Sequence, residues 1–246
     1  MLKQNVSPEN IAVYTSSPES YIKHISFIFK KYKIPFKHKS IILLKDISII
    51  KFLLFIYKTA AGPLLKSKIS TIFNSSYSKN FYHSIDAKTL FLTEFKDFTE
   101  NFNLTEINNN ILSNLLKTDS VKLKYKSLCI LEQLVSQFDS LNSNNTLDKH
   151  IEGFSKLLYF FGLPLKISKN SEIDESVFRD SAGLKNLIEI INETKLSCRK
   201  LNLNDSMDLS EFYEFLGEIC SNNTVKQFDL NIFFISILDL SKSAYR

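Results

Sequence analysis

Apolar residues recur every three or four positions along most of the chain, which is the spacing of one face of an amphipathic helix. The clearest example is the segment 148–161. Its apolar stripe consists of Ile151, Phe154, Leu157, Leu158 and Phe161. Gly162 and Pro164 follow at once and provide a normal stop, because glycine readily ends a helix and proline cannot continue one.

The same spacing predicts further helices. They span residues 46–61, 63–73, 87–102, 105–117, 120–139, 183–201 and 208–221. The first of them is apolar on nearly all sides, which is typical of a central core helix. The last opens with Asp208 three residues before Glu211, an aspartate version of the capping box that satisfies free backbone N–H groups.

The two ends of the chain follow a different pattern. Residues 11–14 form a short, β-branched apolar run, and residues 231–240 are rich in isoleucine and phenylalanine, so that both segments predict strands. A helix is expected to begin at Ser17-Pro18-Glu19, and the chain then turns at Ile34-Pro35-Phe36 into a second strand. The apolar face of this helix would consist of Tyr21, Ile22, Ile25, Ile28, Phe29 and Tyr32.

These elements predict a mainly α fold in which a helical insertion domain is flanked by a small α/β part from the N- and C-terminal segments. We expect residues 1–42 and 228–246 to form the α/β part, and residues 43–227 to form the insertion domain. A parallel pairing of the two ends needs a crossover connection, and the helical body would be that connection.

Composition narrows the class of protein. Only 5 glycines and 5 prolines are present, too few for the turns of an all-β fold, and 44% hydrophobic residues are enough for a real core. Residues 1–10 are polar and do not resemble a signal peptide.

The longest apolar run, residues 47–57, is far shorter than the ~20 residues of a membrane span. Three cysteines without a CxxC spacing are typical of reduced thiols, so we expect a cytoplasmic protein without a membrane partner.

The net charge of +5 appears spread along the chain and permits contact with nucleic acid without requiring it. The strongest local candidate is a group of lysines around the turn at residues 34–36, namely Lys30, Lys31, Lys33, Lys37 and Lys39. Tyr32, Phe36 and His38 are interleaved with them, and this combination can contact phosphates and stack a base. The alternative interpretation is a solvated surface of ordinary lysines.

The segments at the two ends of the chain resemble a known protein family. Residues 9–14 (ENIAVY), Tyr21 and residues 32–36 (YKIPF) resemble a superfamily 1 helicase pattern of strand, helix and IP turn. Residues 43–46 (LLKD) and 49–54 (IIKFLL) resemble the continuation found in AddB/RexB and RecC-like helicase–nuclease subunits. Residues 233–240 (FFISILDL) resemble the strand that precedes the return into the helicase core of this family.

The resemblance implies that the ends belong to a RecA-like domain and that the middle is a helical domain inserted in it. No GxxxxGK[ST] phosphate loop is found in the sequence, so this region is not expected to hydrolyse ATP. We therefore predict a non-catalytic structural, DNA-guiding or partner-docking region of an ATP-dependent helicase–nuclease (exonuclease) subunit in DNA repair and recombination. DNA and a partner subunit are the expected partners, with no cofactor, metal or small-molecule substrate.

Other chemistry is weakly indicated. Asp86 with Glu94-Phe95-Lys96 imitates the D…ExK signature of metal-dependent nucleases, but Glu193-Thr194-Lys195 supplies a second ExK by chance in this lysine-rich chain. The histidines are scattered through the sequence, at His24, His38, His83 and His150. Two alternatives remain open. A freestanding helical adaptor that binds another protein predicts that the reading frame stops after Arg246, and an unrecognised enzyme predicts a polar pocket with clustered carboxylates or histidines.

Overall fold

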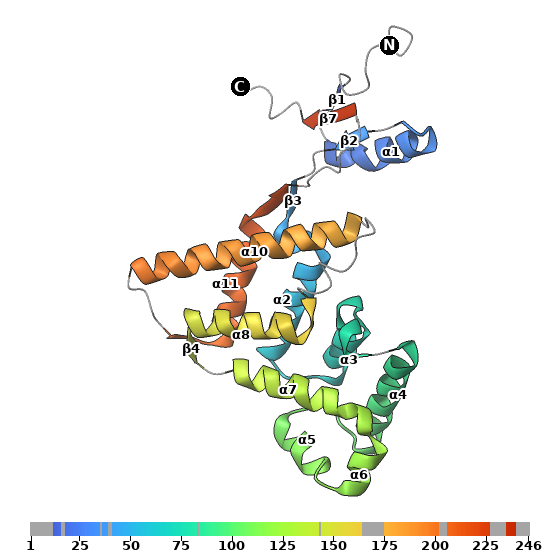
Figure 1. The fold of residues 1–246 in the computed structure, drawn as a ribbon, viewed down its shortest axis with the longest axis vertical. Helices are drawn as coiled ribbons and strands as arrows, with labels where there is room; N and C mark the ends of the chain where they lie inside the picture. Colours follow the sequence, from blue (N-terminus) through green and yellow to red (C-terminus); the bar gives the residue numbers. More distant parts are fainter. Residues whose placement is uncertain are drawn as a thin grey trace. The chain divides into compact units, whose positions relative to one another are not determined.

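The structure is a computed structural model that describes residues 12–15, 18–34, 36–38, 41–82, 84–142, 144–163, 175–201, 206–226 and 235–239. The chain divides into two compact units (Figure 1). Unit 1 consists of Met1–Ile42 and Thr224–Arg246, and unit 2 of Leu43–Asn223. Helices account for most of the described residues, and a small parallel sheet joins the two ends of the chain. The predicted fold class is confirmed.

Unit 1 is built around a three-stranded parallel sheet. Its strands are β1 (Ala12–Thr15), β2 (Phe36–His38) and β7 (Ile235–Asp239), in the order β1-β7-β2. Val13 lies opposite Ile237, and Lys37 lies opposite Ser236. Helix α1 (Pro18–Lys31) forms the crossover between β1 and β2, and the distant strand β7 lies between these two strands. Of the segment 231–240 predicted as a strand, residues 231–234 and residue 240 lie outside the described residues, as does Ile11.

Unit 2 is a helical body. Its helices are α2 (Ser48–Ala60), α3 (Lys66–Asn74), α4 (Ile85–Asn101), α5 (Asn109–Leu115), α6 (Asp119–Lys124), α7 (Cys129–Leu141), α8 (Leu147–Phe160), α10 (Glu175–Lys200) and α11 (Leu209–Asn222). Short 3-10 turns are η3 (Leu44–Asp46), η4 (Ser76–Phe81) and η5 (Lys126–Leu128). Strands β4 (Asn145–Thr146) and β5 (Ser206–Met207) form a short antiparallel pair. A further two-stranded sheet consists of β3 (Ile41–Leu43) and β6 (Thr224–Lys226), and all of its residues except Leu43 belong to unit 1.

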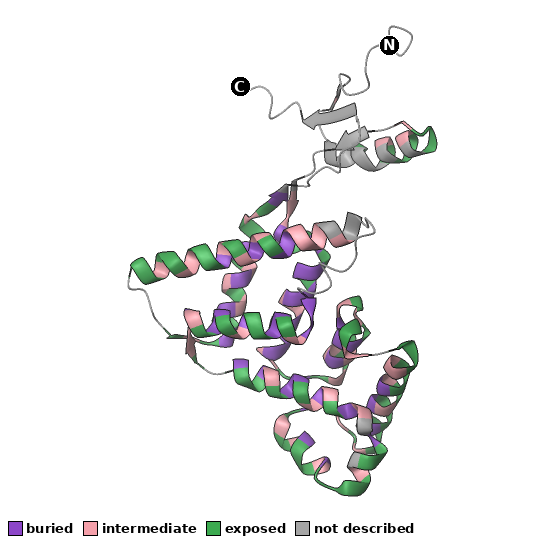
Figure 2. Ribbon diagram, in the orientation of Figure 1, coloured by how far each residue is buried: buried purple, intermediate pink, exposed green. Residues whose placement is uncertain are grey.

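Helix α2 is the centre of the core of unit 2. Ile50, Ile56 and Tyr57 are fully buried there, whereas Lys51 and Lys58 are exposed along a narrow polar edge. Helices α3, α7, α10 and α11 all contact α2. Figure 2 shows the buried positions of unit 2 gathered on α2 and on the facing sides of its neighbours. The nearly all-apolar pattern of this segment therefore reflects contacts on most sides of the helix.

Polar contacts with distant residues hold the first turn of α2 and the turn η3 that precedes it. The backbone N–H of Leu44 donates to the carbonyl of Asn223 at 2.9 Å, so the first and last residues of unit 2 lie side by side. Asp180 on α10 accepts a hydrogen bond from the Ile49 N–H at 3.2 Å and another from the Tyr77 hydroxyl. Burial and the neighbouring Asp180 carboxylate raise the pKa of Tyr77. Asp180 thus caps a helix whose own N-cap residue offers no side-chain hydrogen bond.

Local differences from the sequence-based expectations have identifiable causes. The helix predicted over residues 120–139 is broken at Tyr125 (φ −118°, ψ 53°) into α6, η5 and α7. The break coincides with Glu94, whose carboxylate accepts the backbone N–H of Ser127 at 3.0 Å and its hydroxyl at 2.5 Å, and so caps the new segment. The capping box predicted at Asp208 and Glu211 is confirmed, with both bonds at 2.8 Å.

Candidate functional site

The candidate nucleic-acid site lies at the end of α1. The N–H of Ile34 donates to the carbonyl of Phe29 at 2.8 Å, and Lys33 adopts a left-handed conformation with φ 53°. This is a Schellman-type helix end with a lysine at the position that usually holds glycine. Lys30 and Lys31 belong to the last turn of the same helix, where positive charge is favoured by the helix dipole.

The structure brings three of the five predicted lysines to one helix end. Lys30, Lys31 and Lys33 follow one another through the last turn of α1 and its cap, and the side chains of Lys31 and Lys33 are exposed. Lys37 lies in the middle of β2, opposite Ser236. Lys39 lies outside the described residues. Lys30, Lys31 and Lys33 are therefore neighbours at one helix end, and α1 also contacts the strand β2 that holds Lys37.

Aromatic side chains accompany this charge. Tyr32 is 66% exposed, and the Lys31 Nζ lies 5.9 Å from the centre of its ring, within the range of a cation–π contact. Tyr21 and Ile28 of the predicted apolar face of α1 are also exposed, and so is Phe27, which lies outside that face. Such a surface has cations for phosphate contacts and ring faces on which bases can stack.

The division into units changes the interpretation of the net charge. Unit 1 holds ten lysine or arginine residues and four aspartate or glutamate residues, a net charge of +6. Unit 2, although much larger, holds 21 basic and 22 acidic residues, a net charge of −1. The charge is spread along the sequence rather than gathered into a tail, but the division into units concentrates it. The positive charge of the protein belongs to unit 1.

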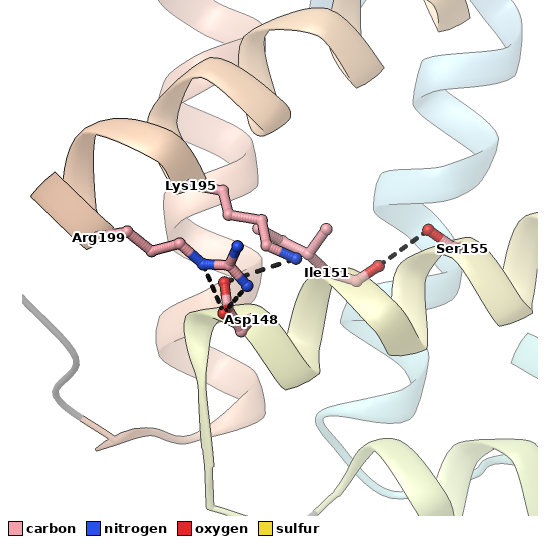
Figure 3. Close-up of polar contacts among 5 residues, drawn as sticks. All are labelled: Asp148, Ile151, Ser155, Lys195 and Arg199. Carbon is pink, nitrogen blue, oxygen red and sulfur yellow. Dashed lines mark hydrogen bonds and ion pairs between the residues drawn. The ribbon is translucent and has the colours of Figure 1, made fainter.

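A second polar site, in unit 2, was not predicted. Figure 3 shows Lys195 and Arg199 of α10 pointing toward Asp148 in the first turn of α8. The Arg199 Nε donates to Asp148 Oδ2 at 2.9 Å, a second guanidinium nitrogen contacts the same oxygen, and the Lys195 Nζ lies 3.6 Å from Oδ1. The hydrogen bond from Arg199 holds the pKa of the Asp148 carboxyl below its ordinary value. Asp148 is far from Lys195 and Arg199 in the sequence. The four-residue spacing of Lys195 and Arg199 indicates only that these two share one face of a helix.

The residues that imitate a nuclease signature are placed apart. Asp86 and Glu94 both lie on α4, eight residues apart, which corresponds to about 12 Å along the helix axis. Glu94 accepts a hydrogen bond from the Ser127 N–H, and Lys195 of the second ExK forms an ion pair with Asp148. Within the described ranges, no three histidine, cysteine, aspartate or glutamate side chains come close enough to hold a metal ion together.

The histidines and cysteines occupy unrelated positions. His150 is buried, with its Nε2 2.9 Å from the carbonyl of Met207 and its ring stacked on Phe212. His24 is exposed on α1, His38 lies in β2, and His83 lies outside the described residues. The thiols of Cys129, Cys198 and Cys220 are free. Burial raises the pKa of the Cys220 thiol to about 12, so it remains protonated at neutral pH.

Comparisons with known proteins identify no relative, so the geometry described above is the main evidence on the function of the protein. No protein-family model matches the chain, and a search of curated proteins finds no significant match. Among the helices that the structure describes, none has the length and apolar character of a membrane span.

Proposed function

We propose that this chain is a non-catalytic, DNA-guiding region of an ATP-dependent helicase–nuclease subunit that acts in DNA repair and recombination. In this proposal unit 1 is the partial RecA-like part and contacts the DNA backbone through the end of α1. Unit 2 is the inserted helical domain. The observation that carries the DNA contact is the concentration of charge, +6 in unit 1 with exposed Lys31 and Lys33 beside the exposed ring of Tyr32.

Two further observations support the proposal. Strands β1 and β7, from opposite ends of the chain, pair in parallel in one sheet, as expected for two edges of one α/β domain that an insertion separates. The three free thiols are typical of a reducing compartment, which supports the cytoplasmic location included in the proposal. A helicase–nuclease partner subunit remains the expected protein partner of such a region.

The test is DNA binding as a function of salt. We expect a labelled single-stranded oligonucleotide to bind the full chain, with an affinity that falls steeply as salt rises. Changing Lys30, Lys31 and Lys33 together to glutamine should make the negative slope of log K against log salt less steep by about 2. Each phosphate contact on a single strand contributes about 0.7 to this slope. Fluorescence anisotropy measures both quantities.

The matched control changes three exposed lysines of unit 2, Lys58, Lys79 and Lys96, to glutamine. It removes the same charge and should leave the slope unchanged, because these residues lie on the unit whose net charge is −1. Equal losses in the two triple variants, or no binding by the unaltered chain at low salt, would refute the DNA-guiding proposal.

A second candidate function is favoured by one observation. The exposed Tyr21, Phe27 and Ile28 on α1 provide an apolar surface of the kind that protein-interaction adaptors use. A freestanding adaptor would bind its partner through these side chains without DNA. Replacement of Phe27 by serine should then abolish binding of the adaptor's protein partner, whereas the triple glutamine variant of Lys30, Lys31 and Lys33 should leave that binding unchanged.

A further inference from the structure

The groove between α8 and α10 in unit 2 has no part in the proposed DNA contact of unit 1. It encloses about 410 Å³, a volume in the range of small-ligand sites. Its lining includes Asp148, Lys149, Ser155, Asn192, Lys195 and Arg199. Figure 3 shows Lys195 and Arg199 reaching from α10 to Asp148, which anchors the groove at the first turn of α8.

Charge in this groove is not balanced. Asp148 is shared by two cations, Lys195 and Arg199, and Lys149 adds a third positive charge to the lining. Glu152 also lines the groove, but its carboxylate pairs with Lys156 at 3.5 Å. The lining therefore carries three cations against two carboxylates, and one of these carboxylates, Glu152, is shared with Lys156. This surplus occurs in a unit whose total charge is −1.

Holding α8 against α10 does not account for both cations. Arg199 alone makes two contacts to one oxygen of Asp148, which already joins the helices. Lys195 lies one helical turn away on the same face, and like charges at this spacing repel each other. Its side chain is only 24% exposed, so water screens this repulsion less than it would on an open surface. A second anion in the groove would remove the repulsion.

The unused donors indicate what kind of anion fits. A guanidinium has five N–H donors and an ammonium has three, and Asp148 occupies only a part of them. Asn192 adds an amide to the lining. The Ser155 hydroxyl donates its proton to the Ile151 carbonyl at 3.1 Å and therefore adds no donor. A ligand with several acceptor oxygens and at least one negative charge matches this set.

We propose that the groove between α8 and α10 binds a phosphate-type oxyanion, through Lys149, Lys195 and Arg199. The anion is either a phosphodiester of a nucleic acid strand or the phosphate of a free phosphorylated compound. Asp148 holds the two cations of α10 in place and does not itself contact the anion. The site does not depend on the DNA contact of unit 1.

Thermal unfolding of the full chain in inorganic phosphate and in chloride, at equal pH and ionic strength, tests the site. Phosphate should raise the Tm of the unaltered chain above its value in chloride, because a ligand that binds only the folded state stabilises it. The variants Lys149→Gln and Lys195→Gln should each weaken the phosphate Kd by about tenfold and remove most of the rise. Each variant is compared with its own Tm in chloride, so a change in basal stability does not obscure the result.

The control is Lys185→Gln, which removes a lysine of the same helix that is exposed and paired with Glu189. It should keep the full rise in phosphate, as should the triple glutamine variant of Lys30, Lys31 and Lys33 in unit 1. The same rise in all variants, or none in the unaltered chain, would overturn the proposal. An oligonucleotide that reproduces the rise identifies a phosphodiester, and a mononucleotide that alone reproduces it identifies a free compound; both results support the site.

Discussion

Gly162 ends α8 in a conformation that an alanine cannot adopt without cost. Its φ is +62°, and its N–H donates to the carbonyl of Tyr159 at 2.9 Å. An added Cβ would lie 1.8 Å from the Nδ2 of Asn80. That amide donates to the carbonyls of Phe161 at 3.1 Å and of Gly162 at 3.2 Å, so it cannot move without losing both hydrogen bonds.

The variant Gly162→Ala should therefore lower the free energy of unfolding by about 3 kcal/mol. The left-handed conformation accounts for about 1–2 kcal/mol, and the loss of the two Asn80 hydrogen bonds adds about 0.5–1.5 kcal/mol each. For a unit of this size the change corresponds to a fall in Tm of about 6–12 °C. Urea and thermal unfolding followed by far-ultraviolet circular dichroism measure it.

Gly217→Ala is the matched control. Gly217 lies inside α11, and an added Cβ there meets no atom within 4 Å. The same substitution should then stabilise the protein by about 0.5–1 kcal/mol, because alanine loses less backbone entropy in a helix than glycine. Changing Asn80 to alanine first should reduce the cost of Gly162→Ala to the conformational part alone. Equal effects of Gly162→Ala and Gly217→Ala, or a cost that does not depend on Asn80, would contradict this reasoning.

Three further predictions concern single side chains. Asp180→Ala should lower the free energy of unfolding by about 1–3 kcal/mol, measured in urea, because it leaves two partly buried donors without an acceptor. Lys33→Gly should raise it by about 1 kcal/mol, since glycine adopts a positive φ without strain. The pKa of Asp148 is lowered in the folded state, so its contribution to stability is present above the ordinary value of 3.8 and is lost as pH falls below it. Arg199→Gln should reduce the fall in Tm over this acidic range, as measured by a pH series of thermal melts, while an unchanged acid limb would contradict the pairing.

Much of the fold follows from local patterns. The stripe of α8, the apolar segment of α2 and the capping box at Asp208 depend on residues within a few positions of one another, so periodicity and cap chemistry predict them. The break at Tyr125 depends instead on Glu94, which lies more than thirty residues away from Ser127 in the sequence. No local pattern contains that contact.

The two candidate sites also differ in how far the sequence predicts them. The lysines at the end of α1 are neighbours in sequence, and the sequence therefore brings them together in advance. The contact of Asp148 with Arg199 joins positions 51 residues apart, and the charge of unit 1 sums residues from both ends of the chain. The first feature depends on which distant helices pack together, which composition and periodicity do not determine, whereas the pairing of the two ends is expected from their strand patterns.

The hydrogen bond between Leu44 and Asn223 bears on the order in which the protein folds. Strand β1 pairs with a strand more than two hundred residues later, and closing so long a loop in an unfolded chain is slow and entropically costly. Once the helical body has folded, its first and last residues are held together, and the loop that remains to be closed is short. The parallel sheet should therefore assemble last, after the helical body has folded and β7 has been synthesised.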